Sequence, residues 1–217
     1  MIMKTLNQYI KEKLIVNKDY RDAGLSPKSF DELRKIIKDR FKTLGSGTEQ
    51  KPIDFNDIDV TNLNTFSNDK GKGIFQGTKF KYIDISYWDV SNVKSMYCMF
   101  AECDELESAG DLSDWDVSKV TNMSSMFYSC KKFNQDISDW DVSKVTSMSN
   151  MFCGCNSFNQ DISDWDVSSV TNMEYIFYNC KSFNQDLSGW NVSNVRHNND
   201  HIFHNCPIKE RFKPKFK

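Results

Sequence analysis

The 217-residue sequence contains only four prolines and nine glycines, and it has no long low-complexity stretch. It also lacks any apolar run of 18 residues, so no membrane-spanning helix and no membrane insertion are expected. Hydrophobic residues make up 39% of the chain and aromatic residues 13%, which is enough for a packed core. Disorder is therefore expected only in short loops and at the extreme C-terminus.

Export signals and a disulfide framework are also missing. The start of the sequence has no uninterrupted apolar region and no small-residue cleavage site, which argues against a secretory signal peptide. The cysteine count is odd, at seven, and does not suit a closed set of disulfides. Reduced thiols and a cytoplasmic or virion-associated location are the expectation from these absences.

Familiar catalytic motifs are absent as well. The sequence has no glycine-rich phosphate loop, no H-E-x-x-H, no G-x-S-x-G and no EF-hand loop. Aspartates are numerous, but acid-base catalysis needs carboxyl groups in unequal environments within a cleft, whereas repeated aspartates have equal ones. No catalytic residue, resident metal or cofactor is predicted, and the chain is expected not to be an enzyme.

The main feature that is present is a tandem repeat. The five tryptophans are spaced by 27, 25, 25 and 25 residues, at Trp88, Trp115, Trp140, Trp165 and Trp190. Each lies in a similar segment, which reads Asp-Ile-Ser-Asp-Trp-Asp-Val-Ser-Lys-Val-Thr around the third tryptophan. A weaker copy has Ile58 in place of tryptophan, so the repeats begin near residue 53.

The pattern inside one copy predicts its secondary structure. Trp140 and Val142 alternate with polar neighbours, which predicts a short strand with one buried face. From Val145 to Phe152 the apolar residues recur at helical spacing, which predicts one or two helical turns. Because one copy cannot bury its own apolar face, the copies are expected to stack into an α+β solenoid, with one short parallel strand and a short helix per repeat.

The repeat also resembles a known family. Ile137, Trp140, Val142 and Val145 overlay the L-x-x-L-x-L-x-x-N frame of leucine-rich repeats, and the 25-residue period lies within their range. Over about residues 53–217 the copies resemble BspA-type leucine-rich repeats, which are found in mycoplasma-type surface lipoproteins and in gut-bacterial and bacteriophage proteins. The resemblance implies a non-enzymatic surface or interaction protein, often an adhesin, although no lipoprotein signal accompanies it here.

Three regions are predicted along the chain. Apolar spacing over residues 5–16, and a capping box at 29–32 that opens a helix through about Phe41, predict an N-terminal helical cap over residues 1–52. A helix pair that docks on a partner or a membrane is the alternative for this region. Residues 53–206 form about six repeats, and residues 207–217 form a basic C-terminal tail.

Charge is divided unevenly between these regions. Residues 87–189 carry 16 acidic and six basic side chains, a net charge of −10, whereas residues 1–52 have a net charge of +5 and residues 190–217 of +4. The acidic residues recur in columns that the predicted strands send outward. The columns predicted to bind a partner are Asp89, Asp116, Asp141 and Asp166, beside Asp114, Asp139 and Asp164.

Two interpretations of these aspartates stay open. In the first, they accept hydrogen bonds from the nearby backbone in Asx turns and are structural. In the second, they form a recognition face for a basic peptide, a basic protein surface or divalent cations. Either way, the acidic surface would repel phosphates and disfavours nucleic acid.

Three other sets of residues have structural and functional interpretations. His197, His201 and His204 would share one face of a helix, where a metal site is possible, but polar end-cap residues are favoured and no metal is predicted. The cysteines that recur 15 or 16 residues after each tryptophan from Trp88 are expected to be small, buried, free thiols. Asn134, Asn159 and Asn184 are expected to form an amide ladder.

The sequence thus favours a protein-binding module that presents an acidic strand face to a basic or proteinaceous partner. The alternative is a structural protein, such as a subunit of a virion or surface layer, whose basic ends make the contacts.

Overall fold

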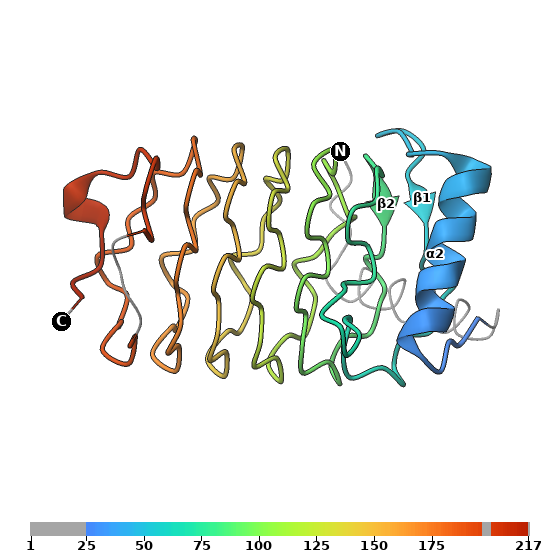
Figure 1. Cartoon of the computed structure of the whole chain (residues 1–217), viewed down its shortest axis with the longest axis horizontal. Helices are drawn as coiled ribbons and strands as arrows, with labels where there is room; N and C mark the ends of the chain where they lie inside the picture. Colours follow the sequence, from blue (N-terminus) through green and yellow to red (C-terminus); the bar gives the residue numbers. More distant parts are fainter. Residues whose placement is uncertain (1–24, 197–200, 217) are drawn as a thin grey trace, which may run out of the picture.

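The computed structural model describes residues 25–196 and 201–216, and within them the chain winds into a stack of coils (Figure 1). The strands are short: β1 (Ile53–Asp54) pairs in parallel with β2 (Ile83–Asp84). Further parallel bridges join residues one repeat apart, at Thr65–Ser95, Ser95–Asn122, Asn122–Ser147 and Ser147–Asn172. Each coil therefore lies against the next, and the 25-residue period is the length of one coil.

One wall of the stack is a hydrogen-bond ladder between coils. The N–H groups of Phe100, Phe127 and Phe152 each donate to a carbonyl of the following coil, at 2.9–3.0 Å. The amide before each of them donates to a carbonyl of its own coil, as Met151 does to Met148 at 3.1 Å. Because the amides alternate between these two partners, the wall satisfies its buried backbone without long strands.

This wall replaces the short helix predicted for each repeat, and that prediction is wrong among the described residues. Asn150 (φ 57°) and Gly154 (φ 76°) adopt the left-handed conformation four residues apart, and equivalent positions in neighbouring coils do the same. A left-handed residue interrupts the hydrogen bonding of a right-handed helix. The apolar residues nevertheless recur at helical spacing, since a turn that repeats every four residues keeps Met148, Met151 and Phe152 on the inner side.

Aromatic columns fill the interior of the coils. Phe100, Phe127, Phe152 and Phe177 stack nearly in parallel, with ring centroids 5.5–5.8 Å apart from one coil to the next. The tryptophan indoles add a polar link, because each Nε1 donates to a carbonyl of the preceding coil, as Trp140 does to Leu112 at 2.9 Å. Tryptophan thus supplies both core volume and a hydrogen bond between coils.

The Trp-Asp-Val-Ser segments, predicted to be strands, instead connect two successive turns in this structure. Trp140 N–H donates to the Ile137 carbonyl at 3.3 Å, and Val145 N–H donates to the Val142 carbonyl at 2.9 Å. Two adjacent turns bury alternate residues just as a strand does, which is why the period-two pattern was misleading. The parallel bridges lie further along the coil, at positions such as Ser147.

Helix α2 (Phe30–Leu44) covers the first coil. Its N-cap Ser29 accepts a hydrogen bond from Glu32 N–H at 3.3 Å, as the capping box predicts, but the Glu32 carboxylate accepts from Lys28 N–H rather than from the N-cap residue. Leu33 and Ile37 are fully buried against the coil. The helix predicted over residues 5–16 lies outside the described residues.

Arg34 closes the hydrogen-bond ladder beneath α2. Its Nη1 donates to the Gly73 carbonyl and, at 2.7 Å, to that of Ile74, while Nη2 donates to the Gln76 carbonyl at 3.1 Å. The N–H groups of this wall donate to carbonyls of the following coil, as Phe75 N–H does to the Met99 carbonyl. The first coil has no coil before it, so its carbonyls on this wall receive no such hydrogen bond. The guanidinium takes the place of that missing coil.

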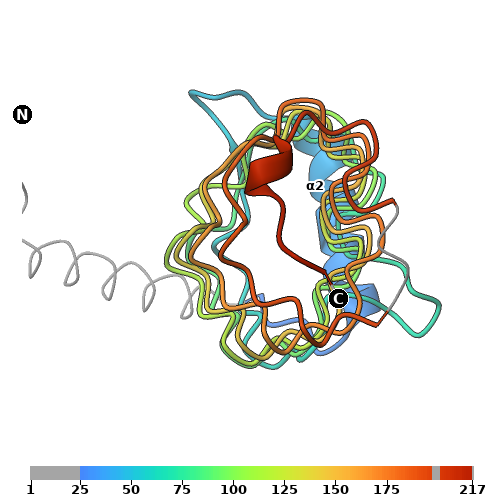
Figure 2. The ribbon, with the colours of Figure 1, turned by 90° about the vertical axis from the view of Figure 1, so that its left-hand side faces the viewer.

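The other end of the stack is covered by the segment predicted as a basic tail. Residues 207–216, which include the short 3-10 helix η1 (Glu210–Phe212), cross the open end of the last coil (Figure 2). Leu187 N–H donates to the Phe212 carbonyl at 2.8 Å, and Ile208 and Pro214 are buried. In the part of the chain that the structure describes, no helix is long and apolar enough to cross a membrane.

Candidate functional site

The predicted aspartate column lies in Asx turns at one corner of the coils. Asp89, Asp116, Asp141 and Asp166 each accept a hydrogen bond from the amide of the serine two residues later, at 3.0–3.1 Å. The structural interpretation of these aspartates is therefore correct for one carboxylate oxygen. The side chains of Asp116, Asp141 and Asp166 are also exposed to solvent.

A second column, which sequence reasoning missed, is built in the same way. Each of its aspartates accepts a hydrogen bond from the amide of the serine two residues later, and Asp136 also accepts one from the Ser138 hydroxyl, at 3.0 and 2.7 Å. The other exposed members are Asp111, Asp161 and Asp186. The signal was available in the sequence, because Asp-x-Ser occurs on both sides of Trp115, Trp140 and Trp165 and before Trp190.

The remaining predicted aspartates lie between these two columns. Asp139 and Asp164 follow the serines of the second column inside the turn that ends at the tryptophan, and their side chains are exposed. Asp114 holds the same exposed position one coil earlier. All seven predicted residues thus lie at one corner, which we call the acidic corner: the three aspartate columns of the Asp-x-Ser-Asp-Trp-Asp-x-Ser segments.

At some of these carboxyl groups, hydrogen bonds from serine favour the ionised form. Ser118 lowers the pKa of Asp116 below its ordinary value, and Ser168 lowers the pKa of Asp166. In the second column, hydrogen bonds from Ser138 lower the pKa of Asp136. Among residues 25–196 and 201–216, no three acidic, histidine or cysteine side chains converge in a way that could hold a metal ion. The acidic corner is therefore a negatively charged surface whose carboxylates are held in place by the turns.

Acid is expected to destabilise the stack through these groups. A carboxyl whose pKa is depressed by folding contributes stability above its unfolded pKa of about 3.9, and that contribution is lost as the pH falls through the folded pKa. The urea midpoint should therefore fall steeply below about pH 4. In a variant with Asp116→Asn, Asp136→Asn and Asp166→Asn the fall should be shallower, and an equally steep fall would contradict a contribution from these three groups.

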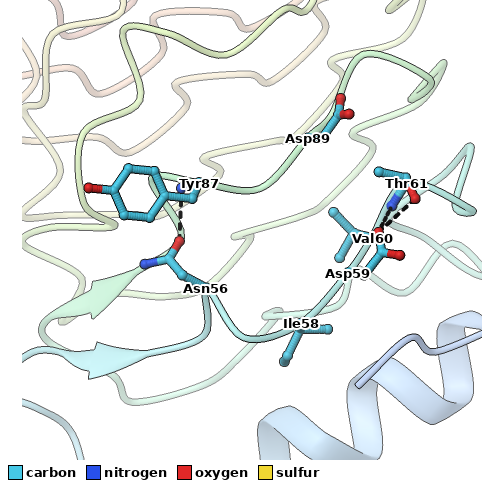
Figure 3. A pocket seen from close by; sticks show the side chains of 7 residues that line it. All are labelled: Asn56, Ile58, Asp59, Val60, Thr61, Tyr87 and Asp89. Atoms are coloured by element: carbon cyan, nitrogen blue, oxygen red, sulfur yellow. Dashed lines mark hydrogen bonds between the residues drawn. The ribbon is translucent and has the colours of Figure 1, made fainter. Parts of the chain in front are cut away.

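Two hollows lie toward the N-terminal end of the acidic corner. The first, lined by Asn56, Asp59, Tyr87 and Asp89 among others, has a volume of about 10 Å³, which is room for one water molecule (Figure 3). In it the Asn56 side chain accepts from Tyr87 N–H at 2.8 Å. This hollow is too small for an organic substrate.

The second hollow is an open groove of about 430 Å³, and its acidic lining residues are Glu49, Asp84 and Glu107. The Tyr82 hydroxyl donates to Glu107, which lowers the pKa of that carboxyl, and Lys132 lies 3.1 Å from it. The sequence contained no repeated signal for this groove, because most of its residues come from the irregular first coils.

The other predicted sets have structural partners. The recurring cysteines donate to carbonyls of earlier coils, as Cys155 does to Phe127 at 2.9 Å, and all seven cysteines are free thiols. Burial raises the pKa of Cys103 to about 11, so its thiol stays protonated at neutral pH. Asn159 N–H donates to the Asn134 side chain, and Asn184 N–H to that of Asn159, which makes the predicted amide ladder.

The predicted histidine set is only partly described. His197 lies outside the described residues. His201 and His204 are exposed, with ring centroids 6.3 Å apart, and each stacks on a tyrosine of the preceding coil.

The stacked coils and the acidic corner define a repeat protein with an open, charged surface. Within that class, a family model described as "Mycoplasma protein of unknown function, DUF285" matches residues 46–109 and 105–213. The chain belongs to this family. The matched segments begin after α2, so this helix lies outside them. No curated protein and no solved structure matches the chain.

Proposed function

We propose that the chain is a non-enzymatic binding module of the BspA-like leucine-rich-repeat type, and that its acidic corner binds a basic segment of a protein partner. The observation that supports this most is the arrangement of the carboxylates. The backbone holds each aspartate of the first and second columns by a hydrogen bond from the serine two residues later, and the coil period repeats the arrangement along the stack.

A surface arranged in this way suits a cationic partner for two physical reasons. Carboxylates already held by the backbone lose little conformational freedom on binding, so less of the interaction energy is spent on ordering them. A row of like charges also attracts an oppositely charged partner over several ångströms and speeds its association at low salt. The adjoining groove beside Glu49, Asp84 and Glu107 continues the negative surface to the first coils.

The test replaces aspartate by asparagine, which removes the charge and keeps the turn. Asn191 shows that asparagine suits this position, because its side chain accepts from Ser193 N–H at 3.2 Å. A variant with Asp116→Asn, Asp141→Asn and Asp166→Asn is expected to fold normally. It should bind a fluorescent decalysine peptide about tenfold more weakly than the wild type, with a smaller dependence on salt, in fluorescence anisotropy.

The matched control changes the same number of charges elsewhere. Asp31→Asn, Asp39→Asn and Asp69→Asn alter exposed side chains outside the acidic corner. This control is expected to bind decalysine nearly as the wild type does. Equal weakening in both triple variants would show that only net charge matters, and unchanged binding in the corner variant would contradict the proposal.

A further inference from the structure

The two last described coils have aromatic or imidazole rings at both outer positions of the ladder wall, whereas the coil with Ser125 and Tyr128 has one such ring. Where one coil has Asn150 and Cys153, the next has Tyr175 and Tyr178, and the last has His201 and His204 in the aligned positions. The inward-facing positions between them stay apolar in all three coils: Met151 and Phe152, Ile176 and Phe177, Ile202 and Phe203. The change is therefore confined to the surface.

These four residues form a compact array of rings. Tyr175 stacks on His201 with ring centroids 5.1 Å apart, and Tyr178 stacks on His204 at 5.0 Å. Within each coil the two rings meet edge to face. The ring centroids of Tyr175 and Tyr178 are 5.6 Å apart, and those of His201 and His204 are 6.3 Å apart. The tyrosines are half-buried and the histidines are exposed, so the rings pack on one another at the surface.

The backbone at Tyr175 is strained. Its φ is 57°, in the left-handed region, which bulky residues rarely adopt and which asparagine tolerates well. The equivalent positions of the two preceding coils, Ser125 and Asn150, adopt the same conformation with small polar side chains. Packing of the coil therefore does not require an aromatic residue here. Strain that the fold does not need is typical of functional positions.

The arrangement of the rings indicates what they bind. Sugars and nucleobases stack on open ring faces, but here each ring has one face against a neighbouring ring of the array. The ring edges are electropositive and carry the tyrosine O–H and imidazole N–H donors. These groups suit carboxylate oxygens. The segment that covers the same end of the stack adds positive charge, from exposed residues such as Lys209, Arg211 and Lys215.

From this we propose a second interaction surface, the ring array of Tyr175, Tyr178, His201 and His204, which binds the carboxylate side chains of an acidic protein segment. The surface is separate from the acidic corner and has the opposite charge preference, so it does not depend on the function proposed above. The stacked rings set the donors in place, and the basic end of the molecule attracts the partner.

The test replaces both tyrosines by small polar residues, with asparagine at position 175 as at Asn150 of the preceding coil. A variant with Tyr175→Asn and Tyr178→Ser is expected to bind a fluorescent decaglutamate peptide about tenfold more weakly than the wild type in fluorescence anisotropy. Its melting temperature should equal or exceed that of the wild type, because asparagine relieves the left-handed strain. A merely structural role for the tyrosines predicts the reverse, with lower stability and unchanged binding.

A second variant and a control complete the experiment. His201→Asn with His204→Asn changes only exposed side chains and is also expected to weaken binding, so it keeps the test decisive if the tyrosine variant fails to fold. Asn150→Ser, at the equivalent left-handed position one coil earlier, should leave binding unchanged. The proposal is overturned if wild-type protein does not bind decaglutamate, or if the array variants that fold bind it as tightly as wild type.

Discussion

Replacement of Phe152 by alanine is expected to lower the free energy of unfolding by about 3–5 kcal/mol. The ring is fully buried in the middle of the stack and contacts aromatic rings of three coils. Its centroid lies 5.8 Å from that of Phe127, 4.1 Å from that of Phe158 and 5.7 Å from that of Phe177. Alanine would leave a cavity between coils that rigid neighbours cannot fill, and equilibrium urea unfolding followed by tryptophan fluorescence measures the loss.

Two further variants separate packing from other effects of this substitution. Phe152→Leu keeps most of the volume and is expected to cost less than half as much as alanine. Tyr128→Ala removes a ring that is 36% exposed on the same wall and should cost under about 1 kcal/mol. If Phe152→Ala costs no more than Tyr128→Ala, the stacked column does not stabilise the coils in the way described above.

The repeat made much of this architecture predictable. The 25-residue spacing of the tryptophans predicts the coil length, and the bridges Asn122–Ser147 and Ser147–Asn172 have that spacing. The capping box predicts the start of α2 at Phe30, because its side-chain hydrogen bonds are local and depend on nearby residues alone. Such features follow from short-range chemistry or from simple periodicity.

The local conformation within a coil was not predictable in the same way. Burial of Met148, Met151 and Phe152 requires only that these side chains point inward, and both a helix and a chain of four-residue turns achieve this. The distinction depends on left-handed residues such as Ser125 and Ser129, whose type gives little hint of that conformation. Inter-coil hydrogen bonds select it, and these bonds arise only when coils stack.

The candidate surfaces show the same limit. The acidic corner could be located because its aspartates recur at a fixed interval. The ring array forms no such column, since Tyr175 and His201 are different residue types, although their positions align in successive coils. The stacking of the rings appears only in the structure, where the coils place the two ring centroids 5.1 Å apart.

Replacement of Arg34 by methionine is expected to lower the free energy of unfolding by about 2–6 kcal/mol. Arg34 is 9% exposed and its guanidinium hydrogen-bonds the carbonyls of Gly73, Ile74 and Gln76. Methionine fills similar space but donates no hydrogen bond, so the Ile74 and Gln76 carbonyls would lose their donors beneath α2, at about 1–3 kcal/mol for each buried group. The Gly73 carbonyl would keep the hydrogen bond from Gln76 N–H at 3.3 Å. Urea unfolding measures the loss, and hydrogen exchange should show faster exchange in α2 and the first coil.

Two comparisons test whether Arg34 caps the first coil through its hydrogen bonds to the carbonyls. Lys35→Met changes an exposed side chain of the same helix and should shift stability by under about 0.5 kcal/mol. Arg34→Lys keeps the positive charge but lacks the planar fork that reaches several carbonyls at once, so it should recover only part of the loss. If Arg34→Met is no more destabilising than Lys35→Met, the first coil does not need a substitute for the missing neighbour, and α2 covers it by apolar contact alone.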